Sequence, residues 1–154
     1  MVGRIVVSLH YAVHNPAHYP KSMEKITLDF IHLCEYSLID MTGKLSLIGL
    51  FENFNFNSFP ASFPKFTVVA TVRFATSEKR DYPARVVILN PDGTEFGKAD
   101  YALRSQGPGL AVLNANFVSR EFRMPGEYGV EIWIGDKKLG RKPFTVTLIE
   151  GAKK

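Results

Sequence analysis

The sequence predicts an all-β protein, an immunoglobulin-like antiparallel β-sandwich of seven to nine strands with little or no helix. Apolar and polar residues alternate over short runs, and turn residues separate the runs at near-regular spacing. No stretch longer than about ten residues shows a convincing helical period. Short strands spaced in this way are typical of a sandwich or barrel.

The alternation predicts five strands directly. Their apolar faces are Leu45, Leu47, Gly49 and Phe51; Phe66, Val68, Ala70, Val72 and Phe74; Leu113, Ala115 and Phe117; Tyr128, Val130, Ile132 and Ile134; and Phe144, Val146 and Leu148. Residues 41–44, 90–93, 106–109 and 135–138 carry the Gly, Asn, Asp and Pro residues that favour turns.

Length and composition favour a single globular domain. The chain has 154 residues, of which 45% are hydrophobic, and its twelve Phe and six Tyr predict a core rich in aromatic rings. The net charge of +4 is too dispersed to indicate nucleic-acid binding. Cys34 is the only cysteine, which excludes an intramolecular disulfide and suits a reducing compartment.

The chain divides by composition into three segments. Residues 1–22 are interpreted as an N-terminal strand followed by a Pro-rich linker, residues 23–150 as the sandwich, and residues 151–154 as a basic tail. The apolar run from Ile5 to Leu9 is too short for a secretory signal, and no segment approaches the roughly 20 apolar residues that span a bilayer. We therefore expect a cytoplasmic protein without a membrane partner.

The N-terminal strand is expected to be ordered by sheet pairing. Ile5, Val7 and Leu9 share one face, and such a strand invites association when it is left unpaired. It can extend the sheet of its own domain or add to the sheet of a neighbouring copy.

Several short motifs resemble a family of uncharacterised bacterial proteins that look like small immunoglobulin-type sandwiches. The motifs are CEYS at 34–37, GKLSLIG at 43–49, SFPA at 58–61 and FPKF at 63–66. They follow the pattern GKLSLIGxF…SFPAxxPxF, and the resemblance covers residues ~24–149. It implies a fold and no activity.

Residues 125–132 are similar to the penultimate strand of many immunoglobulin-like domains. In that strand a tyrosine turns its hydroxyl back to upstream backbone, the tyrosine corner, and Tyr128 is the candidate here. Trp133 has the opposite parity to Ile132 and Ile134, which predicts that it faces away from the core.

No catalytic or metal-binding set emerges, so no cofactor and no metal are expected. Cys34 and His32 could share a strand face, but an apolar context and the lack of a neighbouring cation favour a structural thiol. His10 and His14 would lie about 13 Å apart on a strand, too far to share a zinc ion. The cations at 137–142 are interpreted as a solvated hairpin that guards a sheet edge, with phosphate binding as the alternative.

The Phe cluster at residues 51–66 leaves two interpretations open. Six rings could plug one end of the core, or some of them could form a partly exposed contact patch. The candidate interaction residues are Phe54, Phe56, Phe59, Trp133, Ile5, Val7 and Leu9.

These observations favour a non-enzymatic protein-interaction or assembly module whose partner is a protein or a second copy of the chain. The first alternative is a structural subunit of a homo-oligomeric or virion-like assembly that uses N-terminal strand addition. The second is an enzyme whose cleft is built from loops. A cleft with two polar groups of perturbed pKa would favour the enzyme.

Overall fold

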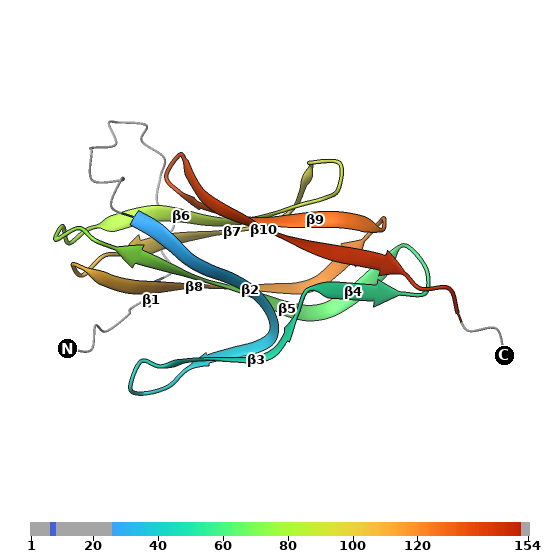
Figure 1. Cartoon of the computed structure of the whole chain (residues 1–154), viewed down its shortest axis with the longest axis horizontal. Coiled ribbons are helices and arrows are strands. Elements are labelled where there is room, and N and C mark those ends of the chain that lie inside the picture. Colours follow the sequence, from blue (N-terminus) through green and yellow to red (C-terminus); the bar gives the residue numbers. More distant parts are fainter. Residues whose placement is uncertain (1–6, 9–25, 152–154) are drawn as a thin grey trace.

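The computed structural model describes residues 7–8 and 26–151, which fold into two β-sheets packed as a sandwich (Figure 1). The strands are β1 (Val7–Ser8), β2 (Ile26–Ile39), β3 (Leu45–Phe51), β4 (Asn53–Phe56), β5 (Ala61–Phe74), β6 (Asp81–Leu89), β7 (Glu95–Arg104), β8 (Gly109–Phe122), β9 (Gly126–Ile134) and β10 (Lys137–Leu148). The described residues contain no helix, so the predicted fold class is confirmed. β2 to β10 give nine strands, and the two-residue β1 is a tenth.

The two sheets have unequal size. The larger has the strand order β1-β7-β6-β9-β10-β4 and the smaller the order β3-β2-β5-β8. All pairs are antiparallel except β10 with β4, which run parallel. β3 and β8 therefore form the edges of the smaller sheet.

The core lies between the sheets, where the predicted alternation holds for four of the five strands. The apolar face of β5 from Phe66 to Phe74 is buried, as are the inward residues of β8 and β9. In β10, Phe144 and Val146 are buried, but Leu148 is 48% exposed because it ends the strand. β3 is the exception: Leu45 and Leu47 pack outside the main core.

The prediction for Tyr128 is confirmed. Its ring is fully buried, and its hydroxyl donates a 2.9 Å hydrogen bond to the carbonyl oxygen of Met124, four residues upstream. Trp133 lies on the outer surface of the larger sheet, as its parity predicts, and its Nε1 donates to Glu131. The orientation of Trp133 follows from strand parity, whereas the hydrogen bond of Tyr128 was expected from the similarity to immunoglobulin-like domains.

Two buried tyrosines should respond oppositely to loss of the hydroxyl. Tyr128→Phe is expected to lower the free energy of unfolding by about 0.5–1.5 kcal/mol, because it removes one satisfied hydrogen bond. Tyr82 is also fully buried, but its hydroxyl has no hydrogen-bond partner among the described residues. Tyr82→Phe should therefore be neutral or stabilising. Urea unfolding of both variants measures the difference, and equal losses would contradict this assignment.

The predicted N-terminal strand is described only at Val7–Ser8. These two residues pair antiparallel with β7, Val7 opposite Leu103 and Ser8 opposite Ala102, in the sheet of their own domain. Ile5, Leu9, the Pro-rich linker and the histidines His10, His14 and His18 lie outside the described residues.

Candidate functional site: the β2–β3 arm

The most distinctive surface feature is a hairpin that we call the arm, residues 36–50, formed by the end of β2 and most of β3. Figure 1 shows it leaving the layer of the smaller sheet and ending as a separate projection. The arm bends at Gly49, which has φ +67°. The positive φ favours glycine there, and a Cβ atom would lie 2.8 Å from Cγ of Glu35, whose exposed side chain would have to move aside.

The tip of the arm is closed by a side-chain cap. Oδ1 of Asp40 accepts hydrogen bonds from the backbone nitrogens of Thr42 and Lys44 and from the Thr42 hydroxyl, at 2.6–3.0 Å. The Thr42 and Lys44 hydrogen bonds hold the pKa of Asp40 below its ordinary value. The tip is therefore a fixed turn.

The inner face of the arm covers part of the outer surface of the smaller sheet. Cys34, Val69 and Val112 are buried there, and Phe30, Leu45 and Leu47 pack against them, which makes a second small core. This explains why Thr67, Val69 and Thr71, on the face of β5 opposite the main core, are also buried.

Asn114 on β8 makes one hydrogen bond to the arm and one to the larger sheet. Its Nδ2 donates to Oγ of Ser37 on the arm at 2.6 Å. The Tyr101 hydroxyl on β7 donates to the Asn114 carbonyl at 2.9 Å, which links the larger sheet to the edge of the smaller one. The arm is thus attached by polar as well as apolar contacts.

A groove of about 440 Å³ lies between the arm and the outer surface of the smaller sheet. Its lining is mainly apolar: Phe30, Leu45, Leu47, Leu50, Leu110 and Val112, with Asp29, His32, Gly43 and Thr71. The Asp29 carboxylate is already paired with Arg73 at 2.8 Å. The groove therefore offers apolar contact and little free charge.

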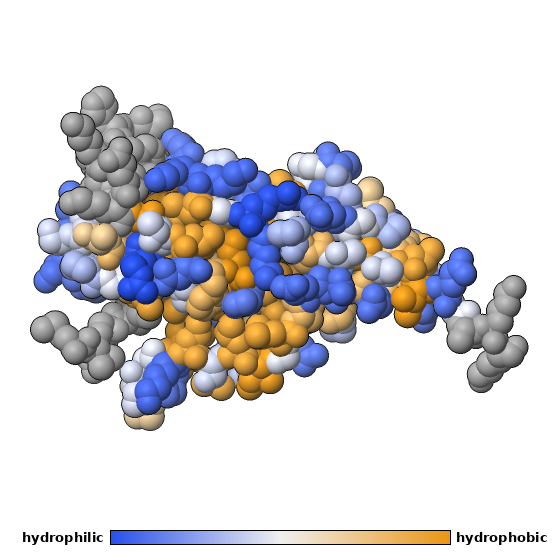
Figure 2. All heavy atoms as spheres, in the orientation of Figure 1, coloured by the Kyte–Doolittle hydropathy of each residue, from blue (hydrophilic) through white to orange (hydrophobic). Residues whose placement is uncertain are grey.

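The outer face of the arm is exposed and apolar. Six of the eleven large apolar side chains exposed in the described residues belong to the arm: Tyr36, Leu38, Ile39, Met41, Ile48 and Leu50. Tyr36, Leu38 and Ile48 lie on its outer face, whereas Ile39 lies opposite Leu45 of the inner face and Leu50 lines the groove. β3 itself carries no charged residue, and the register places Tyr36 directly opposite Ile48. Figure 2 shows the apolar colour gathered where Figure 1 places β3. Patches of this kind mark contact surfaces on soluble proteins.

The structure corrects the predicted contact patch in the Phe cluster. Phe54 is 3% exposed, so its assignment to an interaction surface is wrong. The parallel pairing of β4 with β10 turns its ring into the end of the core, between Phe66 and Phe122. Phe56 and Phe59 are half-buried and pack against the same core, as an end plug does. The paired residues lie 92 positions apart in the sequence, and strand periodicity carries no signal for such a contact.

Trp133 is half-buried within a polar cluster on the larger sheet. Glu131 accepts from the Trp133 indole at 2.9 Å and pairs with Lys138 at 3.1 Å. The Arg85 guanidinium lies 5.4 Å from the indole centroid. The ring is therefore flanked by cations, and whether it contacts a partner stays a prediction.

Most of the cations at 137–142 form ion pairs with neighbouring acidic residues. Lys142 pairs with Glu52 at 2.6 Å, Lys138 with Glu131, and Arg141 approaches Glu127 at 4.0 Å. Paired cations of this kind agree with the interpretation of a solvated hairpin better than with a phosphate grip.

Cys34 is completely buried, and burial raises the pKa of its thiol. A protonated, inaccessible thiol agrees with the structural role expected from the sequence. Within residues 7–8 and 26–151, no three His, Cys, Asp or Glu side chains come close enough to hold a metal ion. The same residues include no helix that could cross a membrane.

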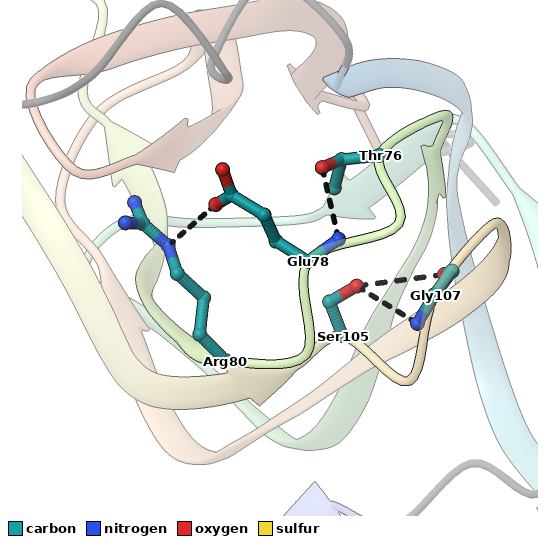
Figure 3. Close-up of polar contacts among 5 residues, drawn as sticks. All are labelled: Thr76, Glu78, Arg80, Ser105 and Gly107. Carbon is teal, nitrogen blue, oxygen red and sulfur yellow. Dashed lines mark hydrogen bonds and ion pairs between the residues drawn. The ribbon is translucent and has the colours of Figure 1, made fainter.

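A polar cluster closes one end of the sandwich, where the loops after β5 and β7 meet (Figure 3). The Ser105 nitrogen donates to the Arg80 carbonyl at 2.9 Å, and Oγ of Thr76 accepts from the Glu78 nitrogen at 3.2 Å. Ser105 Oγ accepts from the Gly107 nitrogen, and Arg80 stacks on Tyr82 at 4.4 Å. These groups bond to one another and to backbone, as loop-ordering groups do.

Tyr101 gives the protein a predicted alkaline transition. Burial raises the pKa of Tyr101 to about 12, whereas an unfolded tyrosine ionises near about 10. The protonated Tyr101 hydroxyl contributes fully to stability below the pKa of the unfolded chain. This contribution is lost as the pH rises from about 10 to about 12. In Tyr101→Phe, the melting temperature should fall less steeply across this window than in the parent chain. Identical slopes would contradict the assignment.

The comparisons agree with the fold. The structure resembles part of a Pseudomonas fluorescens alkylpurine DNA glycosylase, AlkC, bound to DNA with an abasic-site analogue, at a TM-score of 0.52 and 9% identity. The match covers 80% of this chain and 30% of the glycosylase. An immunoglobulin-like protein from Pseudomonas aeruginosa is 18% identical over 79% of this chain and 96% of that one, with a TM-score of 0.44. At these identities the likeness concerns the fold alone.

The two packed sheets and the tyrosine corner at Tyr128 define the chain as an immunoglobulin-like β-sandwich protein. More narrowly, it belongs to a family of unknown function, DUF6941, whose model matches residues 29–147. A search of curated proteins finds no match. The family match agrees with the resemblance noted in the motifs and adds no activity to it.

Proposed function

We propose that this protein is a non-enzymatic interaction module that binds a protein partner through the outer face of the β2–β3 arm. The observation that carries the proposal is the concentration of exposed apolar side chains on one ordered hairpin. Tyr36, Leu38 and Ile48 are 38–52% exposed, although they lie side by side on a hydrogen-bonded ladder. A partner that excludes water from these side chains would gain about 25 cal/mol of binding free energy for each Å² of apolar surface buried.

The geometry also supports a preformed surface. The tip is capped by Asp40, and the inner face is held by the Cys34 cluster and by Asn114. A rigid hairpin loses little conformational entropy on binding, which leaves more of the contact energy as affinity.

Site-specific photo-crosslinking tests this function. p-Benzoylphenylalanine placed at position 36 of the full chain is expected to form adducts with one defined polypeptide in cells, and Ile48→Asp in the same chain should abolish them. The matched control places the crosslinker at Glu95, an exposed residue of β7. Absence of adducts from position 36, or equal adducts from position 95, would contradict the proposed function.

A further inference from the structure

We infer that the groove between the arm and the smaller sheet is a binding site for a small, uncharged molecule that has an apolar body and one polar group. The inference goes beyond the proposed function, because the groove lies on the inner side of the arm and the proposed contact surface on its outer face. Three features of the groove support it: its size and lining, its charges, and one buried hydroxyl that has no hydrogen-bond partner.

The groove has the size and the lining of a small-molecule site. Its volume of about 440 Å³ is within the range of about 300–1,000 Å³ that is usual for such sites. A cavity of about 150 Å³ is enough for a benzene molecule, so this groove admits a molecule with several rings. Leu45 and Leu47 form the wall on the arm, and Phe30 and Val112 belong to the wall on the sheet. The hydrogen bond of Ser37 to β8 holds the arm in place, so the groove is formed before a ligand enters.

The charges of the groove favour an uncharged ligand. Asp29 carries the carboxylate of the described lining, and Arg73 donates to both of its oxygens, at 3.4 and 2.8 Å. The same lining contains no lysine or arginine, and the ring of His32 packs against Phe30 with the centroids 5.0 Å apart. An ion that entered the groove would lose part of its hydration without gaining a free opposite charge.

Thr71 gives the groove a polar group that lacks a partner. It lies on β5 between Phe30 and Val112, on the face of the smaller sheet that the arm covers, and it is 4% exposed. Its Oγ1 forms no hydrogen bond within the described residues, whereas Oγ1 of Thr67, on the same face of β5, donates to Oδ1 of Asn116 at 2.8 Å. Buried hydroxyls are normally hydrogen-bonded. A rotation about the Cα–Cβ bond of Thr71 would turn the hydroxyl toward a polar group on the ligand, and it breaks no existing hydrogen bond.

Two related dyes test the chemical class of the ligand. N-Phenyl-1-naphthylamine is uncharged, carries one N–H group and becomes fluorescent in apolar surroundings, whereas 8-anilino-1-naphthalenesulfonate has the same ring system with an added sulfonate. We expect the full chain to bind the uncharged dye saturably at one site, and the anionic dye at least about tenfold more weakly. Equal affinities for the two dyes, or no saturable binding of the uncharged one, would overturn the inference.

Substitutions test the place of the site. Leu110 lines the groove and is 44% exposed, so Leu110→Asp should leave the fold intact and weaken binding of the uncharged dye more than about tenfold. The matched controls are Val118→Asp, on the same face of β8 outside the groove lining, and Ile48→Asp, on the outer face of the arm. Both should leave the dissociation constant unchanged. Binding that survives Leu110→Asp, or that is lost equally in the controls, would overturn the site.

Thr71→Val tests the buried hydroxyl while keeping the shape of the side chain. We expect it to weaken binding of the uncharged dye between about twofold and about tenfold, because one net hydrogen bond is lost, and we expect Thr67→Val to leave the affinity unchanged. Circular dichroism and thermal melting confirm that each variant folds. An unchanged affinity in Thr71→Val would overturn the assignment of its hydroxyl to the ligand. None of these results depends on the adducts formed from position 36, so this inference and the proposed function can fail separately.

Discussion

Phe54→Ala is expected to lower the free energy of unfolding by about 3–5 kcal/mol, one of the two largest effects of a single substitution in this protein. Phe54 is buried, and its ring contacts six other phenylalanines: Phe51, Phe56, Phe63, Phe66, Phe122 and Phe144. Truncation leaves a cavity at the place where β4 closes the core, and cavities of this kind add to the lost transfer energy. Chemical denaturation with a two-state fit measures the loss.

Phe56 provides the matched control for this prediction. It lies two residues away in β4 but is only half-buried, so Phe56→Ala should cost clearly less than Phe54→Ala. If Phe54→Ala lowers the free energy of unfolding by less than about 1 kcal/mol, the ring is not in the core, and the contact-patch interpretation of the Phe cluster would hold instead.

Val69→Asp is the second substitution with a large expected effect, at least about 3 kcal/mol. Val69 points away from the main core, yet it is completely buried, because the arm lies over it. A carboxylate there would either remain buried without a partner or push the arm off the sheet. The free energy of unfolding, measured in urea, reports the first outcome, and faster amide exchange in the arm reports the second.

Val118→Asp tests whether the loss of stability expected at Val69 comes from burial under the arm or from a charge on the sheet surface. Val118 lies on the same outer surface of the smaller sheet but is 60% exposed. We expect a change of no more than about 0.5 kcal/mol, as for an ordinary surface position. Similar losses at the two positions would mean that the arm does not cover Val69.

Local pattern was enough to predict the core strands. The alternation from Phe66 to Phe74 and from Tyr128 to Ile134 depends only on neighbouring residues, and both sets are buried. Turn residues marked the hairpins, and Tyr128 showed the tyrosine corner. Each of these features is determined within about ten residues of chain.

The features that the sequence did not predict depend on distant contacts. Phe54 is buried only because β4 pairs with β10, and Val69 only because the arm bends back over β5. The bend rests on one glycine, Gly49, whose positive φ has no signature in an apolar run. β3 is uncharged and carries apolar residues on both faces, which is a sequence signal for an exposed contact surface. The alternation of its apolar residues, taken alone, predicted a core strand instead.

The central claim, that a protein partner covers the outer face of the arm, is tested most directly by hydrogen–deuterium exchange of residues 45–51 in the isolated chain and in its complex with the polypeptide crosslinked from position 36. We expect amides of β3 to exchange more slowly in the complex, and Ile48→Asp to remove the difference while amides of β5 stay unchanged. Exchange rates in β3 that are the same in both samples would contradict the claim.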